Sequence, residues 1–181
     1  MKIPATATIA ASLLFAVSST LQANHHGEHT PLDVRTATID LGMVVSDLEK
    51  SLKFYTEACG FTPTGEFSVN EQVTKDSGLT EGTVLTIKKL SLGKGKGATT
   101  LKLMQPAKAP KKADQEYITS NLGFRYLTLH VHSMDAVQER LKKAGVPILS
   151  KGPVAIPGTK VFLTVVKDPD GNFVEFVGPK G

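Results

Sequence analysis

The chain contains very little cysteine, since Cys59 is the only one among 181 residues. A single cysteine cannot form an internal disulfide, so no disulfide framework holds this fold together. Cys59 ends a helical pattern just before Gly60, and no neighbouring His or Lys in the sequence would lower the pKa of its thiol. We therefore interpret Cys59 as a packed core residue and not as a nucleophile.

The chain also lacks an apolar stretch of the ~20 residues that a membrane-spanning helix needs. The N-terminal stretch from Ile3 to Val17 is apolar or small and follows a positive charge at Lys2. Residues 18–23 then end in Ala23, a small residue suited to signal peptidase. Residues 1–23 are therefore predicted to be a signal peptide, with a retained anchor as the less favoured interpretation. The mature protein is expected to be periplasmic or secreted and free of the membrane.

No arginine-rich helix and no interleaved aromatic stripe accompany the positive charge of the chain. The formal net charge is +4, and removal of Lys2 with the signal peptide lowers it by one. The excess lies largely in lysines of a glycine-rich turn and a linker: Lys94, Lys96, Lys108, Lys111 and Lys112. Such loop charges are typically solvated, so nucleic-acid binding is not predicted.

Cleavage after Ala23 leaves 158 residues (181 − 23), which is ample for one hydrophobic core and small for two. Residues 24–36 are polar and are predicted to form a flexible arm. The arm contains His25, His26 and His29, which could bind a metal ion. No rigid element fixes their geometry, so an incidental tail is the favoured interpretation.

The remaining sequence repeats one pattern. A strand-like run from Asp40 precedes a helical pattern that ends at Gly60, and a matching run from Tyr126 precedes one that ends at Gly145. Both halves close on the same kind of strand, residues 101–106 in the first and residues 174–179 in the second. Two copies of one supersecondary unit predict a pseudo-symmetric single domain with a cleft between its halves.

Module one is predicted to span residues 37–106. It begins with a strand at about 38–45, followed by a helix that Ser46 caps, with Glu49 completing a capping box. A short strand at 65–69 comes next, and residues 70–82 are polar and irregular, long enough for a lid over a site. The module ends in a hairpin of strands 83–92 and 98–105.

Residues 107–121 contain prolines without apolar periodicity and are predicted to be a linker, and module two spans residues 122–179, so the domain covers 37–179. Its elements repeat the order of module one: a strand at 124–131, a helix at 134–144 capped by Ser133, a weak strand near Ile148, and strands at 160–166 and 172–177. The run Asp168-Pro-Asp-Gly171 predicts a tight turn before the last strand.

Together these features resemble the vicinal oxygen chelate superfamily, which includes glyoxalase I, extradiol dioxygenases, methylmalonyl-CoA epimerase and the bleomycin- and fosfomycin-resistance proteins. The motifs that carry the resemblance are residues 45–55, 144–146 and 168–175, together with both strand openings. The resemblance implies an α+β fold in which two βαβββ modules form one curved, cup-shaped, eight-stranded sheet. One such fold hosts many chemistries, so function has to be argued from the site.

Enzymes of that superfamily typically hold a divalent metal with four residues, two from each module. By motif, these positions fall at Asp40, Lys102, Tyr126 and Glu175. Asp40 and Glu175 supply carboxylate oxygens, whereas the phenol of Tyr126 ionises near ~10 and the ammonium of Lys102 has no lone pair. We therefore predict that no cofactor is bound, with a weakly held divalent ion at Asp40 and Glu175 as the alternative. Lys102 is expected to pair with one of these two carboxylates.

Strand alternation places further side chains in the same cup. Thr128, Lys102, Met104 and Phe173 are the candidate ligand-binding residues. His130 and Tyr126 are the candidate catalytic residues, because imidazole titrates near neutral pH and can act as a general base. A hydrogen-bonded packing role is the alternative for His130.

The favoured function is that of an exported protein that binds or sequesters a small molecule without a metal, similar to the bleomycin-resistance branch. The first alternative is a divergent glyoxalase-like lyase or isomerase with a degenerate metal site. The second is an accessory domain with a vestigial cup. The resemblance also implies homodimer formation, and the identity of the ligand is beyond the sequence.

Overall fold

The computed structural model describes residues 32–36, 38–108 and 110–181. The predicted signal peptide and the histidines of the arm lie outside these residues. Residues 35–181 form one unit of the chain, and the account below concerns that unit. None of the described helices is long and apolar enough to cross a membrane.

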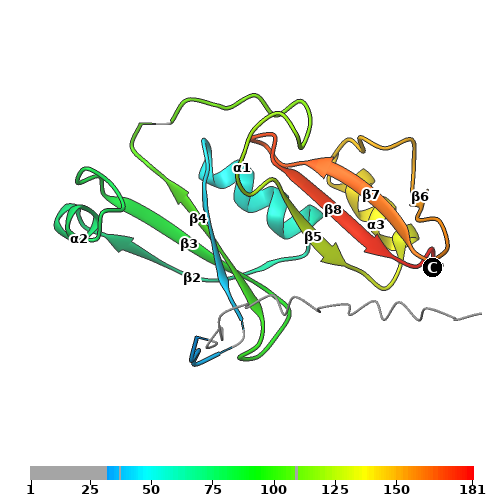
Figure 1. Ribbon diagram of the computed structural model, residues 1–181, viewed down its shortest axis with the longest axis horizontal. Coiled ribbons are helices and arrows are strands. Elements are labelled where there is room, and N and C mark those ends of the chain that lie inside the picture. Colours follow the sequence, from blue (N-terminus) through cyan, green and yellow to red (C-terminus); the bar gives the residue numbers. More distant parts are fainter. Residues whose placement is uncertain (1–31, 37, 109) are drawn as a thin grey trace, which may run out of the picture. The chain divides into compact units, whose positions relative to one another are not determined.

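Module one builds a four-stranded sheet in the order β1-β4-β3-β2 (Figure 1). Its strands are β1 (Asp40–Val44), β2 (Thr62–Val69), β3 (Leu85–Leu92) and β4 (Thr99–Gln105). The first and last strands pair in parallel, and the other pairs are antiparallel. The predicted hairpin is therefore present as β3 and β4.

Module two repeats this topology in a second sheet of order β5-β8-β7-β6, and its first and last strands again pair in parallel. Its strands are β5 (Tyr126–His130), β6 (Val154–Ala155), β7 (Phe162–Lys167) and β8 (Phe173–Gly178). The repeat predicted from the sequence is thus confirmed. Within the described residues the eight strands form two four-stranded sheets, without a backbone ladder that joins them into one.

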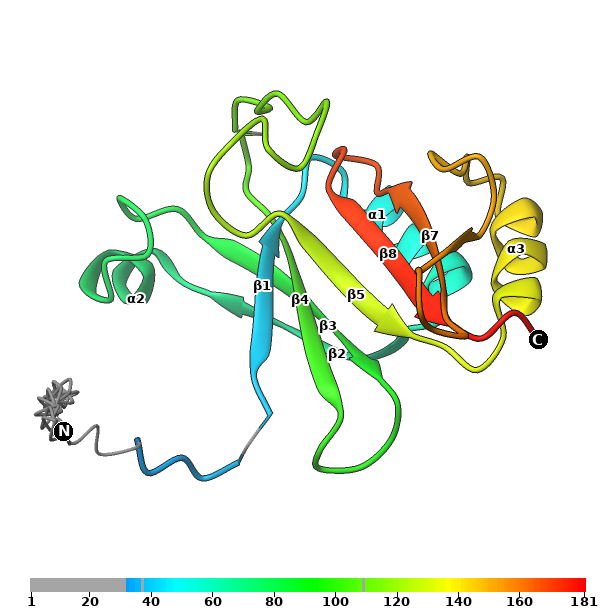
Figure 2. The ribbon, with the colours of Figure 1, turned by 45° about the vertical axis from the view of Figure 1, so that its right-hand side comes forward.

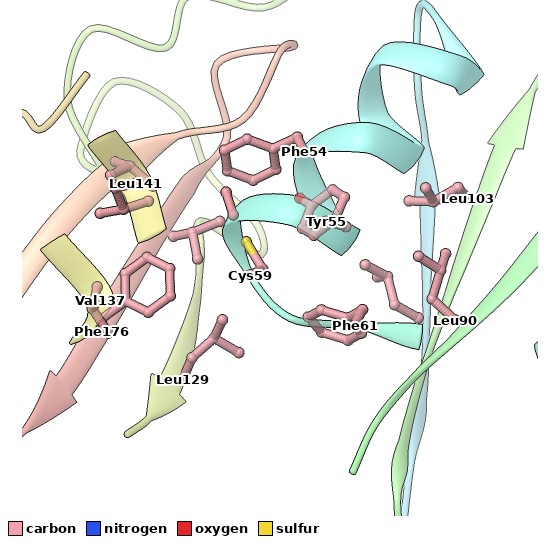
Figure 3. Close-up of a cluster of buried hydrophobic side chains, with 14 of the residues drawn as sticks. Phe54, Tyr55, Cys59, Phe61, Leu90, Leu103, Leu129, Val137, Leu141 and Phe176 are labelled. Atoms are coloured by element: carbon pink, nitrogen blue, oxygen red, sulfur yellow. The ribbon is translucent and has the colours of Figure 1, made fainter. Parts of the chain in front are cut away.

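The core lies between the sheets and the helices that cover one face of each sheet. Helix α1 (Leu48–Lys53) continues as a π-helical segment, η1 (Phe54–Ala58), and α3 (Met134–Lys143) is its counterpart. In Figure 3 the α1–η1 helix lies between Leu90 and Leu103 of module one and Val137, Leu141 and Phe176 of module two. One hydrophobic core therefore joins both modules.

The π turn positions the residues that this helix buries. The backbone N–H of Cys59 donates to the carbonyl of Phe54, five residues earlier, at 3.3 Å. The wider turn allows Phe54, Tyr55, Ala58 and Cys59 all to face the core. Burial raises the pKa of the Cys59 thiol to about 12, which agrees with the predicted core role.

The predicted capping box at Ser46 is wrong. Asp47 is the N-cap of α1, and its side chain accepts from the backbone N–H of Lys50 at 3.0 Å. Ser46 instead contacts Asp170 of module two, with its N–H donating to Oδ2 at 3.0 Å and its hydroxyl also bonded to the carboxylate. Two adjacent residues could each cap the helix, and a tertiary partner decides between them.

Residues 70–82 are also more regular than predicted, because they contain helix α2 (Glu71–Asp76). Asn70 caps this helix by accepting from the N–H of Val73 at 2.9 Å. Thr74 is the only buried residue of this helix, so the sequence has no apolar periodicity that would predict the helix. Near Ile148 the structure has a single bridge to Val166, and β6 follows six residues later.

The remaining helix signals are confirmed. The Ser133 side chain accepts from the N–H of Ala136 at 3.1 Å and caps α3. Gly60 and Gly145 follow the two helices with φ of +82° and +67°, the left-handed conformation that favours glycine.

Candidate functional site

Each sheet has an open face, which is the face turned away from the helices. On the open face of module one, the Nζ atom of Lys102 lies 2.7 Å from Oδ2 of Asp40. The two side chains are 31% and 48% exposed, so the pair remains in contact with solvent. The predicted ion pair therefore forms with Asp40.

The electrostatics of this pair follow from its geometry. The hydrogen bond from the Lys102 ammonium holds the pKa of Asp40 below its ordinary value, and Thr100 and Lys89 add smaller contributions in the same direction. Met104, a predicted ligand contact, lies on the same face, with its Cε 3.1 Å from where a Cβ on Gly42 would stand. At this end of the module, the Asp40 carboxylate already has a protein cation as its partner.

On the open face of module two, the hydroxyl of Thr128 donates to Oε1 of Glu175. The two residues are direct partners in the parallel register of β5 and β8. Tyr126 stands opposite Phe173 in the same register and is 53% exposed. His130 is exposed at the end of β5, and no hydrogen bond fixes its imidazole among the described contacts.

The predicted site residues are thus brought together in two pairs, Asp40 with Lys102 and Thr128 with Glu175. No described hydrogen bond or salt bridge joins the first pair to the second. Residues 32–36, 38–108 and 110–181 contain no group of three or more His, Cys, Asp or Glu side chains arranged to hold a metal ion.

A buried polar cluster between the modules was not predicted from the sequence. The hydroxyl of Tyr55 and the amide of Asn172 each donate to Oδ2 of Asp168 at 2.9 Å. The backbone N–H groups of Asp170 and Asn172 donate to Oδ1. Burial, and then the adjacent Asp168 carboxylate, raise the pKa of Tyr55 well above its ordinary value. The run Asp168-Pro-Asp-Gly171 predicts the turn at Asp168, but no local sequence pattern indicates that Tyr55 is its partner.

A cavity of about 570 Å³ lies on the open face of module two, between the sheet and the linker. We call it the linker pocket; it is lined by Glu116, Tyr117, Ile118, Thr119, Leu149, Ser150, Val165, Lys167 and Phe173. Phe173 is a predicted ligand-binding residue. The other lining residues were missed, because the linker has no periodicity that points to a site and meets residues 149–150 and β7 only in the folded chain.

A second cavity of about 1000 Å³, the helix groove, lies between the end of η1 and α3. Arg140 crosses it and donates to the backbone carbonyls of Thr56 and Glu57 at 2.8 and 2.6 Å. These bonds satisfy carbonyl groups at the end of the helix, so Arg140 ties α3 to η1. None of the predicted site residues lines this groove.

The family model of the Glyoxalase/Bleomycin resistance protein/Dioxygenase superfamily matches residues 37–176, which cover both modules. The chain belongs to this superfamily. The match confirms the predicted resemblance, and the paired sheets agree with its glyoxalase-like fold.

Solved structures support the same fold. A glyoxalase family protein from Bacillus cereus is 19% identical with a TM-score of 0.66, and the match covers 84% of this chain and 100% of that one. A mutant of glyoxalase I from Zea mays is 20% identical with a TM-score of 0.59 over 78% of this chain and 45% of that one. A glyoxylase/bleomycin resistance protein/dioxygenase domain from Frankia sp. is 19% identical with a TM-score of 0.57, covering 83% and 94%. No curated protein matches the chain.

The residues at the superfamily's metal positions do not fit a divalent cation. The Lys102 ammonium lies within hydrogen-bond distance of Asp40 and would repel a metal ion placed beside that carboxylate. Tyr126 would have to ionise its phenol to serve as a ligand. Glu175 has suitable chemistry and no cationic partner among the described residues, and its carboxylate accepts a hydrogen bond from Thr128. Of the four positions, only Glu175 therefore offers a carboxylate without a cationic partner.

Proposed function

We propose that the mature protein is an exported member of the superfamily that binds or sequesters a small molecule without a divalent metal. The observation that carries this proposal is the ion pair of Asp40 and Lys102, whose atoms lie 2.7 Å apart. A fixed ammonium supplies the positive charge that a metal would otherwise bring to this carboxylate. The open faces, with Lys102, Met104, Thr128 and Phe173, would supply polar and apolar contacts to the ligand.

Binding is favoured over catalysis because the candidate catalytic side chains lack orienting partners. A general base needs a neighbour that fixes its tautomer and direction, and no described hydrogen bond does this for His130. The alternative lyase or isomerase would use Asp40 and Glu175 around a weakly held metal. Both carboxylates already have a protein partner, which favours the metal-free proposal.

Elemental analysis of the purified mature protein tests this proposal. We expect no stoichiometric zinc, nickel, manganese or iron in the wild type, and the same result for Glu175→Ala. Glu81→Ala, which removes an exposed carboxylate outside the site, is the matched control. Stoichiometric metal in the wild type and in Glu81→Ala, absent from Glu175→Ala, would contradict it.

Export and assembly are parts of the same proposal. The charged start, apolar stretch and small residue at Ala23 support cleavage after that residue. The protein recovered from the extracytoplasmic fraction should therefore have the mass of a chain that begins at Asn24. Superfamily members often form dimers, so we expect twice the chain mass in sedimentation equilibrium.

A further inference from the structure

The linker pocket has rigid walls on one side. Val165 pairs with Glu175 and Lys167 pairs with Phe173 in the antiparallel register of β7 and β8, so these side chains share the open face of module two. Leu149 and Ser150 form a second wall. Its volume of about 570 Å³ lies within the ~300–1,000 Å³ of small-molecule sites.

The linker forms the other side of the pocket. Figure 2 shows the linker curving toward the start of β8, and two side-chain bonds hold it there. The amide of Gln115 donates to Oδ1 of Asn172 at 3.1 Å, and Nζ of Lys167 donates to the backbone carbonyl of Glu116 at 3.2 Å. Residues 116–119 are thereby fixed over the sheet, and the pocket is built from two parts of the chain.

Lys167 is the only cationic side chain among the residues that line the linker pocket. The ammonium of Lys167 lies 4.8 Å from the ring centroid of Phe173 and, among the described residues, has no salt bridge to an acidic side chain. Its bond to the Glu116 carbonyl uses one of three donors.

We propose that the linker pocket binds a small monocarboxylate with an aromatic or branched aliphatic body. The carboxylate accepts from the ammonium of Lys167. The body lies against Phe173, Val165 and Ile118. A cationic ligand is disfavoured by Lys167, and a neutral apolar ligand leaves its charge unpaired. This inference rests on the proposed function and narrows it: it names the ligand class, and of the four candidate ligand contacts only Phe173 lines the linker pocket.

Nuclear magnetic resonance titration of the mature protein with 3-phenylpropionate, compared with its neutral amide 3-phenylpropionamide, tests the inference. We expect saturable shift changes confined to residues 116–119, 149–150, 165–167 and 173, and about tenfold weaker binding of the amide, because a charge-assisted hydrogen bond is lost at a partly exposed site.

Variants separate the contribution of charge from that of fold. Lys167→Met and Lys167→Gln should weaken 3-phenylpropionate by about tenfold and leave the amide unchanged. Lys160→Met, which removes an exposed lysine of the same module outside the pocket, should change neither. Ile118→Ser, in the linker, should weaken both compounds because it removes apolar contact area.

Equal affinity for the acid and the amide would overturn the inference. Shift changes that map to the helix groove or to the Asp40–Lys102 face would do the same, as would equal effects of Lys167→Met and Lys160→Met or no binding at all. The metal content of the protein is measured separately, by elemental analysis. A metal-bearing protein that still binds the acid at this pocket refutes only the metal-free proposal, and a metal-free protein that does not bind it there refutes only this inference.

Discussion

The ion pair of Lys102 and Asp40 bears on metal binding at the Asp40 carboxylate more than on the stability of the fold. Both side chains are partly exposed, and exposed ion pairs typically contribute ~0–1 kcal/mol. Their consequence is chemical, because the carboxylate at one of the expected metal positions is held by an ammonium 2.7 Å away.

The pKa of Asp40 reports this pair directly. Lys102→Met should raise the pKa toward its ordinary value of 3.8, measured by ¹³C titration of the carboxyl carbon. Because the pair lowers the pKa of the folded state, its stabilisation is present above the unfolded value and is lost as pH falls through the folded value. Lys89→Met, which removes a smaller electrostatic influence on the same carboxyl, should raise the pKa less. An unchanged pKa in Lys102→Met would contradict the ion pair.

The hydrogen bond from Tyr55 to Asp168 joins the two modules within the buried core. Tyr55→Phe removes one of four described hydrogen bonds to the Asp168 carboxylate, three others coming from Asn172 and Asp170. The free energy of unfolding should fall by about 1–3 kcal/mol, measured by urea denaturation below the pH at which tyrosine ionises. Tyr117→Phe, at an exposed tyrosine, should leave it unchanged. Equal stability of the two variants would show that the Tyr55–Asp168 bond is not important.

At the scale of elements, the sequence predicts regular segments well and tertiary choices poorly. Helix α3 and its Ser133 cap follow from local chemistry, because apolar spacing, a capping hydroxyl and Gly145 all agree. The start of α1 does not, since Ser46 and Asp47 are both competent caps and Asp170, 124 residues away, engages the first. Helix α2 has six residues and a single buried side chain, too little for periodicity to reveal.

Substitutions at the start of α1 test this assignment. Asp47→Ala should lower the unfolding temperature measured by circular dichroism, and Asp47→Asn should restore it, because asparagine also caps helices. In a double-mutant cycle, Ser46→Ala should couple to Asp170→Ala, whereas Asp47→Ala should be additive with it. Coupling between Asp47 and Asp170 in place of Ser46 would contradict the contacts described.

At the scale of the whole molecule, the duplication determines the fold and leaves the chemistry to a few side chains. Two modules of one topology share a core around the α1–η1 helix, as the repeat predicts. The four expected metal positions rest on the resemblance to the superfamily motifs alone. That Lys102 pairs with Asp40 and not with Glu175, and that Thr128 bonds Glu175, required the register of the strands. The linker pocket could not be predicted, because residues 116–119 and Lys167 meet only in the folded chain.

The most direct test of the metal-free account is a manganese titration of the ¹⁵N-labelled mature protein. Mn²⁺ broadens the amide signals of residues near it, so substoichiometric ion reveals where a carboxylate site binds. We predict that Asp40, Lys102 and Glu175 lose no more intensity than the exposed Glu81. Selective broadening of Asp40 together with Glu175 at substoichiometric Mn²⁺ would contradict the account, because it would mean that a metal displaces Lys102 from Asp40.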